Sequence, residues 1–273
     1  MNNKICFIGG GNMAASLVGG LINNAYPCEL ISVADLDQSK LQQLAEQFSI
    51  NTTTDNQAAV KHADVVVLAV KPQVLASVCS DIKESLDKSA LIISIAAGIR
   101  STDIDRWLGN NNAIVRCMPN TPSLIQAGAT GLYANPQISA KQKQVAEQIL
   151  GAAGITLWVE DESQLDAVTA VSGSGPAYFF LFMEAMQRAG SQLGLDEKTA
   201  GLLAKQTALG AARMALEGED DPATLRAKVT SKGGTTAAAI ASFEANDFAQ
   251  IIQQALNAAR DRAIELADEL GKQ

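Results

Sequence analysis

The sequence pattern of this chain changes near residue 160. Before that point, short apolar runs bounded by turn residues alternate with segments whose apolar residues recur every three or four positions. Continuous apolar runs are typical of strands buried on both faces, and the recurring pattern is typical of amphipathic helices. Their alternation predicts an α/β fold with a mostly parallel, doubly wound sheet and right-handed crossovers.

Seven apolar runs are the expected strands of this sheet. They cover residues 4–9, 30–35, 64–70, 90–97, 113–118, 128–134 and 154–160. Helical patterns lie between most of them, and the clearest cover residues 38–48 and 139–150. In the first of these, Leu41, Leu44 and Phe48 would share one face.

Past residue 161 the strand pattern ends and long helices are expected. They cover residues 175–194, 197–218 and 248–270, and glycines stand where each would stop. The segment AYFFLFMEAM in the first helix is hydrophobic around nearly its whole circumference, so it must be buried on all sides. One small helical domain can hardly do this alone, and we expect a homodimer with intertwined helices.

The first expected strand leads into a glycine-rich turn, Gly9-x-Gly11-x-x-Ala14, that opens a helix. Gly9 allows a tight turn, Gly11 lets the backbone approach a pyrophosphate, and Ala14 permits close helix–strand packing. The helix N-terminus adds amide donors and the positive end of its dipole. In this context the motif predicts a Rossmann-type dinucleotide-binding domain over residues 1–160.

The choice between NAD and NADP stays open in the sequence. Asp35 ends the second expected strand, where a carboxylate would bind the ribose hydroxyls of NAD and repel the 2′-phosphate of NADP. Ser39 and Lys40 follow on the next helix and could reach that phosphate. Asp35 alone favours tolerance of NAD. Two further strand ends, 69–73 and 95–99, carry Pro or small residues and would face the same crevice.

Charge and composition argue against several partners. The net charge is −8 and no dense run of Lys or Arg exists, so neither nucleic acid nor an anionic membrane is expected as a partner. No apolar run reaches membrane-spanning length, and the N-terminus has no signal-peptide anatomy. Cys6, Cys79 and Cys117 have apolar neighbours and are expected as reduced core thiols, which fits a cytoplasmic location.

The single histidine, His62, precedes an expected strand and would lie in a solvated loop. A histidine triad, a two-histidine metal site or a histidine general base would each have to use this one residue. We therefore expect neither a metal site nor histidine-dependent dehydrogenase chemistry.

Six stretches taken together resemble a known family. The segments FIGGGNM, AVKPQ, SIAAGI, RCMPNTP, VSGSGPAY and TSKGGTT occur in the order and spacing of pyrroline-5-carboxylate reductases. The resemblance covers essentially the whole chain. It implies hydride transfer from NADPH or NADH to the cyclic imine 1-pyrroline-5-carboxylate, giving L-proline. It also implies a C-terminal all-helical dimerisation and substrate domain over residues 161–273, in homodimers or a decamer of dimers.

The resemblance also assigns site residues. The implied cofactor contacts are Ile8, Gly9, Gly10, Gly11, Asn12, Met13, Asp35, Asn56, Ala69, Val70, Lys71, Pro72, Ser94, Ile95, Ala96 and Ala97. The implied substrate loop is 229–236, with Val229, Ser231, Gly233, Gly234, Thr235 and Thr236 as contacts. Thr236 matches the family's hydroxyl near the ring nitrogen and is the catalytic candidate. Glu162 matches, less closely, an acidic residue near the amino acid.

The segment RCMPNTP ends a strand on the same side of the sheet and adds Met118, Pro119 and Asn120 as substrate-binding candidates. Its prolines would stiffen the loop, and Asn120 could donate hydrogen bonds. In VSGSGPAY, the glycines and Pro176 suit the start of a helix.

The chemistry agrees with this family. A carbonyl reductase must protonate a developing alkoxide and usually needs His, Lys or Tyr nearby, whereas a protonated imine already carries the charge that draws the hydride. Such a substrate needs orientation and a carboxylate anchor. In SKGGTTAAAI, the glycines would let the backbone turn, and Thr235 or Thr236 would cap the helix beginning at the alanines. Its exposed amides would form a carboxylate cradle.

Two residues depart from the family pattern: Lys232 stands where the family usually has proline, and Asp35 stands where many members have a phosphate-binding residue. Alternatives also remain. A β-hydroxyacid dehydrogenase would need a lysine on the helix over 175–194, which has none. Another imine reductase and a non-catalytic dinucleotide-binding regulator are the others, although a regulator would leave the SKGGTT loop without a purpose.

Overall fold

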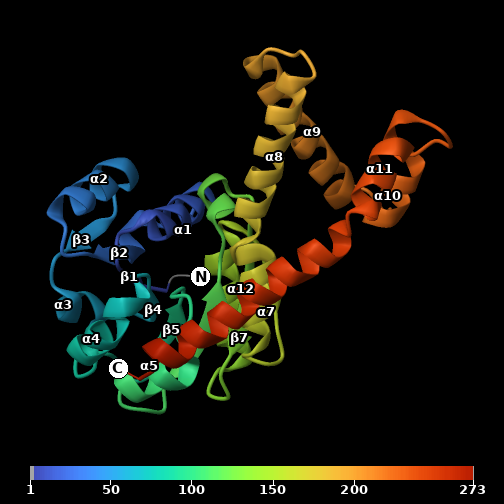
Figure 1. Cartoon of the computed structure of the whole chain (residues 1–273). Helices are drawn as coiled ribbons and strands as arrows, with labels where there is room; N and C mark the ends of the chain where they lie inside the picture. The colour runs from blue at the N-terminus through green and yellow to red at the C-terminus, as the bar shows by residue number, and fades with distance from the viewer. Residues whose placement is uncertain (1–2, 273) are drawn as a thin grey trace. The chain divides into compact units, whose positions relative to one another are not determined.

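The computed structural model describes residues 3–272 and divides into two compact units (Figure 1). The first unit is the chain up to Ser174 together with the chain from Ala258 onward. The second unit is Gly175–Asn257.

An eight-stranded sheet forms the centre of the first unit, in the order β3-β2-β1-β4-β5-β6-β7-β8. The strands are β1 (Ile5–Ile8), β2 (Ile31–Ala34), β3 (Asn51–Thr53), β4 (Val65–Leu68), β5 (Leu91–Ser94), β6 (Ala113–Met118), β7 (Gly128–Ala134) and β8 (Gly154–Trp158). All pairs are parallel except β6 with β7. The predicted doubly wound, mostly parallel sheet is confirmed.

Helices of the first unit cover both faces of the sheet. They are α1 (Asn12–Asn23), α2 (Gln38–Phe48), α3 (Asn56–Val60), α4 (Pro72–Ile82), α5 (Ser101–Trp107), α6 (Ala140–Gly151) and α7 (Gln164–Val168). Alternate residues of the central strands β1, β2, β4, β5 and β6 enter two separate cores: Phe7 belongs to the core under α1, α2 and α6, whereas Cys6 and Ile8 belong to the core under α4 and α5. This alternation explains why these strands are apolar on both faces. In β8, by contrast, Ile155 and Leu157 are 57% and 62% exposed, so the expectation that the strand over 154–160 is buried is wrong.

Two features of the sheet differ from the sequence pattern. The short strand β3 was not expected, because its residues Asn-Thr-Thr have no apolar run. Strand β7 runs antiparallel to β6, with Met118 opposite Gly131. Only residues 119–127 connect the two strands, including a 3-10 turn at Thr121–Ile125, and a parallel pairing needs a crossover of about a dozen residues or more.

The second unit is entirely helical within the described residues. It contains α8 (Gly175–Gln192), α9 (Glu197–Glu217), α10 (Pro222–Lys228), α11 (Thr235–Ala245) and the first part of α12 (Phe248–Leu270). Pro176 is the second residue of α8, as the sequence predicts. The expected helices over 175–194, 197–218 and 248–270 are confirmed within two residues.

The unit boundary lies at Ser174, and not at the change of pattern near residue 160. Residues 161–174 form α7 and a π-helical turn, Thr169–Gly173, that belong to the sheet unit. The C-terminal part of α12 returns to the same unit, where Arg100 pairs with Asp268 at 2.6 Å. How function divides between residues 1–160 and 161–273 stays a prediction.

The remaining sequence expectations concern single residues and segments. Cys6, Cys79 and Cys117 are buried free thiols, and His62 is exposed, as expected. Within residues 3–272, no helix combines the length and the apolarity that crossing a membrane requires. The same residues contain no cluster of His, Cys, Asp or Glu that could hold a metal ion.

Candidate active site

The cofactor candidates gather at one edge of the sheet in the first unit. Strand β1 lies between β2 and β4, so the chain leaves β1 toward one side and later continues from β4 toward the other. Ligands of doubly wound sheets bind at such a switch point, outside the carboxyl ends of the strands. The predicted cofactor residues follow β1, β2, β4 and β5 at this edge or end those strands, and Asn56 begins α3.

The turn from β1 into α1 has the shape that a dinucleotide requires. Gly9 has a φ of +104°, and a Cβ at this position would stand 2.7 Å from the carbonyl oxygen of Ala69. A Cβ on Gly11 would meet no atom within 4 Å, which leaves open space beside the backbone. Gly11 is also the N-cap of α1, and no side chain caps the helix. The first amides of α1 are therefore free to bind a pyrophosphate.

Asp35 is fixed directly beside this turn. Its Oδ2 accepts a hydrogen bond from the backbone N–H of Gly10 at 2.7 Å, and its Oδ1 accepts one from the N–H of Asp37 at 2.9 Å. Its side chain is 16% exposed. The carboxylate is thus held in one orientation at the end of β2, where a dinucleotide-binding sheet places its ribose contact.

The ends of β4 and β5 offer backbone more than side chains. Ser94 is fully buried, and its carbonyl oxygen accepts a bond from the Cys117 thiol at 3.1 Å. Ala96 is buried as well, whereas Ala97 is exposed. Lys71 is the N-cap of α4 without a side-chain cap, and Pro72 is its first residue. Small residues and free amides at this edge fit a dinucleotide.

The side chain of Asn120 makes hydrogen bonds to two backbone groups of the protein. Its Nδ2 donates to the carbonyl oxygen of Ser172 at 3.1 Å, and its Oδ1 accepts from the N–H of Ala129 at 2.9 Å. Beside it, a Cβ on Gly173 would stand 2.5 Å from the end of the Met118 side chain. The loop after β6 therefore holds the π-helical turn that precedes α8. Asn120 is placed to orient this turn, in addition to its predicted role as a donor to substrate.

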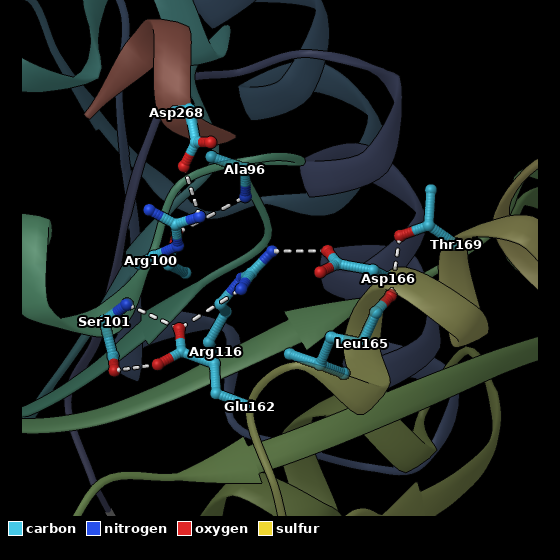
Figure 2. A network of polar contacts seen from close by, with 10 residues as sticks. Ala96, Arg100, Ser101, Arg116, Glu162, Leu165, Asp166, Thr169 and Asp268 are labelled. Atoms are coloured by element: carbon cyan, nitrogen blue, oxygen red, sulfur yellow. Dashed lines mark hydrogen bonds and ion pairs between the residues drawn. The ribbon is translucent and has the colours of Figure 1, made fainter. Parts of the chain in front are cut away.

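A polar network that the sequence interpretation missed lies next to this loop (Figure 2). Arg116 on β6 has a side chain only 6% exposed, and its guanidinium lies 3.2 Å from Glu162 and 3.9 Å from Asp166. Glu162 also accepts bonds from both the N–H and the hydroxyl of Ser101, each at 2.6 Å, and so caps α5 from outside the helix. The network ties β6, α5 and α7 together.

Burial shifts the ionisation of groups around this network. Burial raises the pKa of Asp166, while the nearby charge of Arg116 opposes that rise. Burial also raises the pKa of the Cys117 thiol, which keeps it protonated at neutral pH. A lone arginine within the apolar run AIVRCM was the sequence signal for this network, because a buried charge requires a partner.

The predicted substrate loop belongs to the second unit. Gly233 has a φ of +72°, a left-handed conformation that glycine adopts without strain. Helix α11 begins at Thr235, and its N-cap is Gly234, with no side-chain cap. The expectation that Thr235 or Thr236 caps this helix is therefore wrong, because both threonines lie inside its first turn. The first amides of α11 stay free, as a carboxylate cradle requires.

The predicted site residues are divided between the two units of the structure. The cofactor candidates share one edge of the sheet in the first unit. The substrate candidates Met118, Pro119 and Asn120 belong to that unit, whereas 229–236 belongs to the second. Lys232 and Thr235 are exposed, and Thr236 is half-buried.

Comparisons with known proteins agree with a dinucleotide site at this edge of the sheet. Residues 4–98 match the family model described as NADP oxidoreductase, coenzyme F420-dependent, and residues 162–266 match that for pyrroline-5-carboxylate reductase dimerisation. Together with the glycine turn and the free helix amides at this edge of the sheet, the match of residues 4–98 defines the class: an oxidoreductase that uses NADP or NAD. The chain is 54% identical to a pyrroline-5-carboxylate reductase of Pseudomonas aeruginosa over 98% of both chains. It belongs to the pyrroline-5-carboxylate reductase family.

Solved structures support the same assignment. A pyrroline-5-carboxylate reductase from Coxiella burnetii matches with a TM-score of 0.95 and 48% identity, over 98% of this chain and 99% of that one. A pyrroline carboxylate reductase from Plasmodium falciparum with NADP bound matches with a TM-score of 0.85 and 31% identity, over 97% and 98%. The family resemblance and the fold class predicted from the sequence are confirmed.

Proposed function

We propose that this chain reduces 1-pyrroline-5-carboxylate to L-proline with NADH or NADPH, as an imine reductase, an oxidoreductase acting on a CH–NH group. The observation that carries the proposal is the uncapped N-terminus of α11, which follows a left-handed glycine and presents free amides with two threonine hydroxyls. This group of donors suits a small carboxylate. The high identity to named relatives supports the same substrate.

The proposed roles follow from what each group can bind. The free amides of α1 would hold the pyrophosphate, and the residues ending β4 and β5 would line the nicotinamide side. Reduced nicotinamide supplies a hydride when it is bound. The carboxylate of the substrate would be held by the loop 229–236. The imine nitrogen needs little help from an acid, since its protonated form already attracts the hydride.

Thr236 is the proposed catalytic contact in this loop. It is half-buried in the first turn of α11, and its hydroxyl would orient the ring nitrogen. Val229, Ser231, Gly233, Gly234 and Thr235 are the proposed anchors of the carboxylate, and Met118, Pro119 and Asn120 the proposed contacts from β6.

We also propose that the protein is a cytoplasmic homodimer and that these dimers assemble further into a decamer. The match of residues 162–266 to a dimerisation family supports the dimer. The buried free thiols support a reducing compartment.

The direct test is oxidation of NADH and NADPH in the presence of 1-pyrroline-5-carboxylate. Turnover with at least one cofactor is expected, and none is expected with 1-pyrroline, which lacks the carboxylate. Thr236→Ala should lower kcat/KM while leaving cofactor binding unchanged, and Thr236→Ser should restore part of the loss. Absence of turnover with both cofactors would overturn the proposal.

A further inference from the structure

We propose that the corner between β2 and α2 makes this enzyme select NADH over NADPH, with Asp35 and Asp37 as the specificity-determining residues. The inference rests on the proposed function, because it concerns the hydride donor of that reaction. It concerns the adenosine ribose, which carries two hydroxyls in NADH and a 2′-phosphate in NADPH.

Asp35 has acceptor capacity left for a ribose. Each of its carboxylate oxygens accepts one backbone hydrogen bond, from Gly10 and from Asp37. A carboxylate offers about four lone-pair sites, so about two stay available. The two backbone bonds fix the group before any ligand arrives, which lowers the entropic cost of binding hydroxyls. A phosphate placed against the same carboxylate would meet like charge.

The groups that could hold a 2′-phosphate are already engaged by Asp37. Its Oδ1 accepts a bond from the hydroxyl of Ser39 at 2.7 Å and one from the N–H of Ser39 at 3.0 Å. The N–H of Lys40 points to the same oxygen at 3.4 Å. The Ser39 hydroxyl bond lowers the pKa of Asp37, so this carboxylate stays charged at neutral pH.

The only cation in these contacts is shared between two carboxylates. The ammonium of Lys40 lies 3.7 Å from Asp37 and 4.0 Å from Asp35. The three side chains together carry one negative charge. NADP sites commonly place an arginine near the 2′-phosphate, and no arginine stands in the segment between β2 and the middle of α2. The corner thus provides the ribose with an acceptor and leaves a phosphate without a free cation.

The test is direct titration of the free enzyme with NADH and with NADPH, without imine, followed by cofactor fluorescence. A charge-assisted hydrogen bond gained by only one cofactor corresponds to a roughly tenfold or larger difference in Kd. We expect NADH to bind more tightly by that factor. Equal binding, or tighter binding of NADPH, would overturn the inference. Because no imine is present, this result is independent of whether pyrroline-5-carboxylate is the substrate.

Two variants separate the roles of the carboxylates. Asp37→Ser keeps an N-cap residue on α2 but removes the charge, so NADPH should bind more tightly while NADH changes little. Asp35→Asn keeps the shape of the side chain and should weaken NADH. The matched control is Asp196→Ser, which changes the N-cap of α9 in the same way, and both affinities should stay unchanged. Unchanged NADPH binding in Asp37→Ser would remove Asp37 from the mechanism of selection.

Discussion

The side chain of Arg116 connects three segments of the sheet unit. Its guanidinium faces two carboxylates, Asp166 on α7 and Glu162 just before that helix, and Glu162 also caps α5 through Ser101. Further along the same strand exit, Asn120 holds the carbonyl of Ser172. Arg116 in β6 and Asn120 in the loop just after it therefore hold the two ends of the segment that leads into α8.

The first prediction concerns removal of this cation. Arg116→Met should leave Glu162 and Asp166 without their partner, and breaking a buried ion pair destabilises by about 3–5 kcal/mol. We expect about 3 kcal/mol, the low end, because both carboxylates keep some exposure. The measurement is the free energy of unfolding in denaturant. Lys83→Met, which removes an exposed cation 3.9 Å from Glu84, is the control and should have little effect. Equal losses in the two variants would contradict the prediction.

The second prediction concerns pH. Burial raises the pKa of Asp166 in the folded state above its ordinary value of 3.8, so the folded protein binds this proton more tightly than the unfolded chain does. The contribution is therefore complete below 3.8 and is lost as the pH rises through the folded pKa. The stability of wild type relative to Asp166→Asn should fall over this range. Unfolding free energies from below 3.8 to neutrality test the sign, and a relative stability that rises with pH would disprove it.

Among the elements, the turn from β1 to α1 contains two glycines that differ in the reason for their lack of a side chain. Gly9 is required by the fold, since it has a φ of +104° and no room for a Cβ. Gly11 has room and an ordinary φ of −75°, so its missing side chain is not required for folding. The open space beside it is where we propose that the pyrophosphate approaches.

The third prediction uses this contrast. Gly9→Ala should destabilise the protein by roughly 1–3 kcal/mol or more through strain and the clash with Ala69. Gly11→Ala should leave the melting temperature nearly unchanged and weaken NADH binding, because the added methyl group stands where the pyrophosphate would approach. Thermal unfolding and cofactor titration of both variants test this pair. A Gly11→Ala protein with normal cofactor affinity would remove the dinucleotide from this turn.

Elements also show what the sequence could and could not predict. The buried central strands and the long helices were predicted well, because their periodicity depends on the core and extends over many residues. Strand β3 was missed because it is polar at the edge of the sheet, and the antiparallel β7 depends on a short connection more than on composition. The Rossmann turn was predicted from local spacing alone. The Arg116 network was not, since its members come from segments distant in sequence.

The start of α11 marks the same limit within the site. The sequence indicated correctly that glycines and threonines of 229–236 open a helix, but not which residue occupies the cap. Boundaries shift by one residue with the backbone angles at Gly233 and Gly234, which side-chain types alone do not determine.

At the scale of the whole molecule, the second unit exposes too much apolar surface for a monomer. The consecutive residues Phe179, Phe180 and Leu181 of α8 are 66%, 63% and 67% exposed. Successive helical residues point about 100° apart, so apolar surface extends around most of the helix. Surfaces of this kind mark contacts between chains.

The fourth prediction is therefore the oligomeric state. Light scattering should give a mass of at least two chains, each of 28.6 kDa. If the dimers assemble into a decamer, the mass should be that of ten chains. Leu181→Glu should reduce the mass toward one chain, whereas Val74→Glu, an exposed apolar residue of α4, should not. A monomeric wild type would contradict the dimer.

The discontinuity of the first unit has a consequence for genetic dissection. Topologically, the helical unit is an insertion: the chain leaves the sheet unit after Ser174 and re-enters it at Ala258, along α12. A fragment that stops at residue 160 would lose Glu162, Asp166 and Asp268, so Arg100 and Arg116, two of its three arginines, would lose the carboxylates with which they pair. Chimaeras with relatives of this family would therefore need two matched junctions.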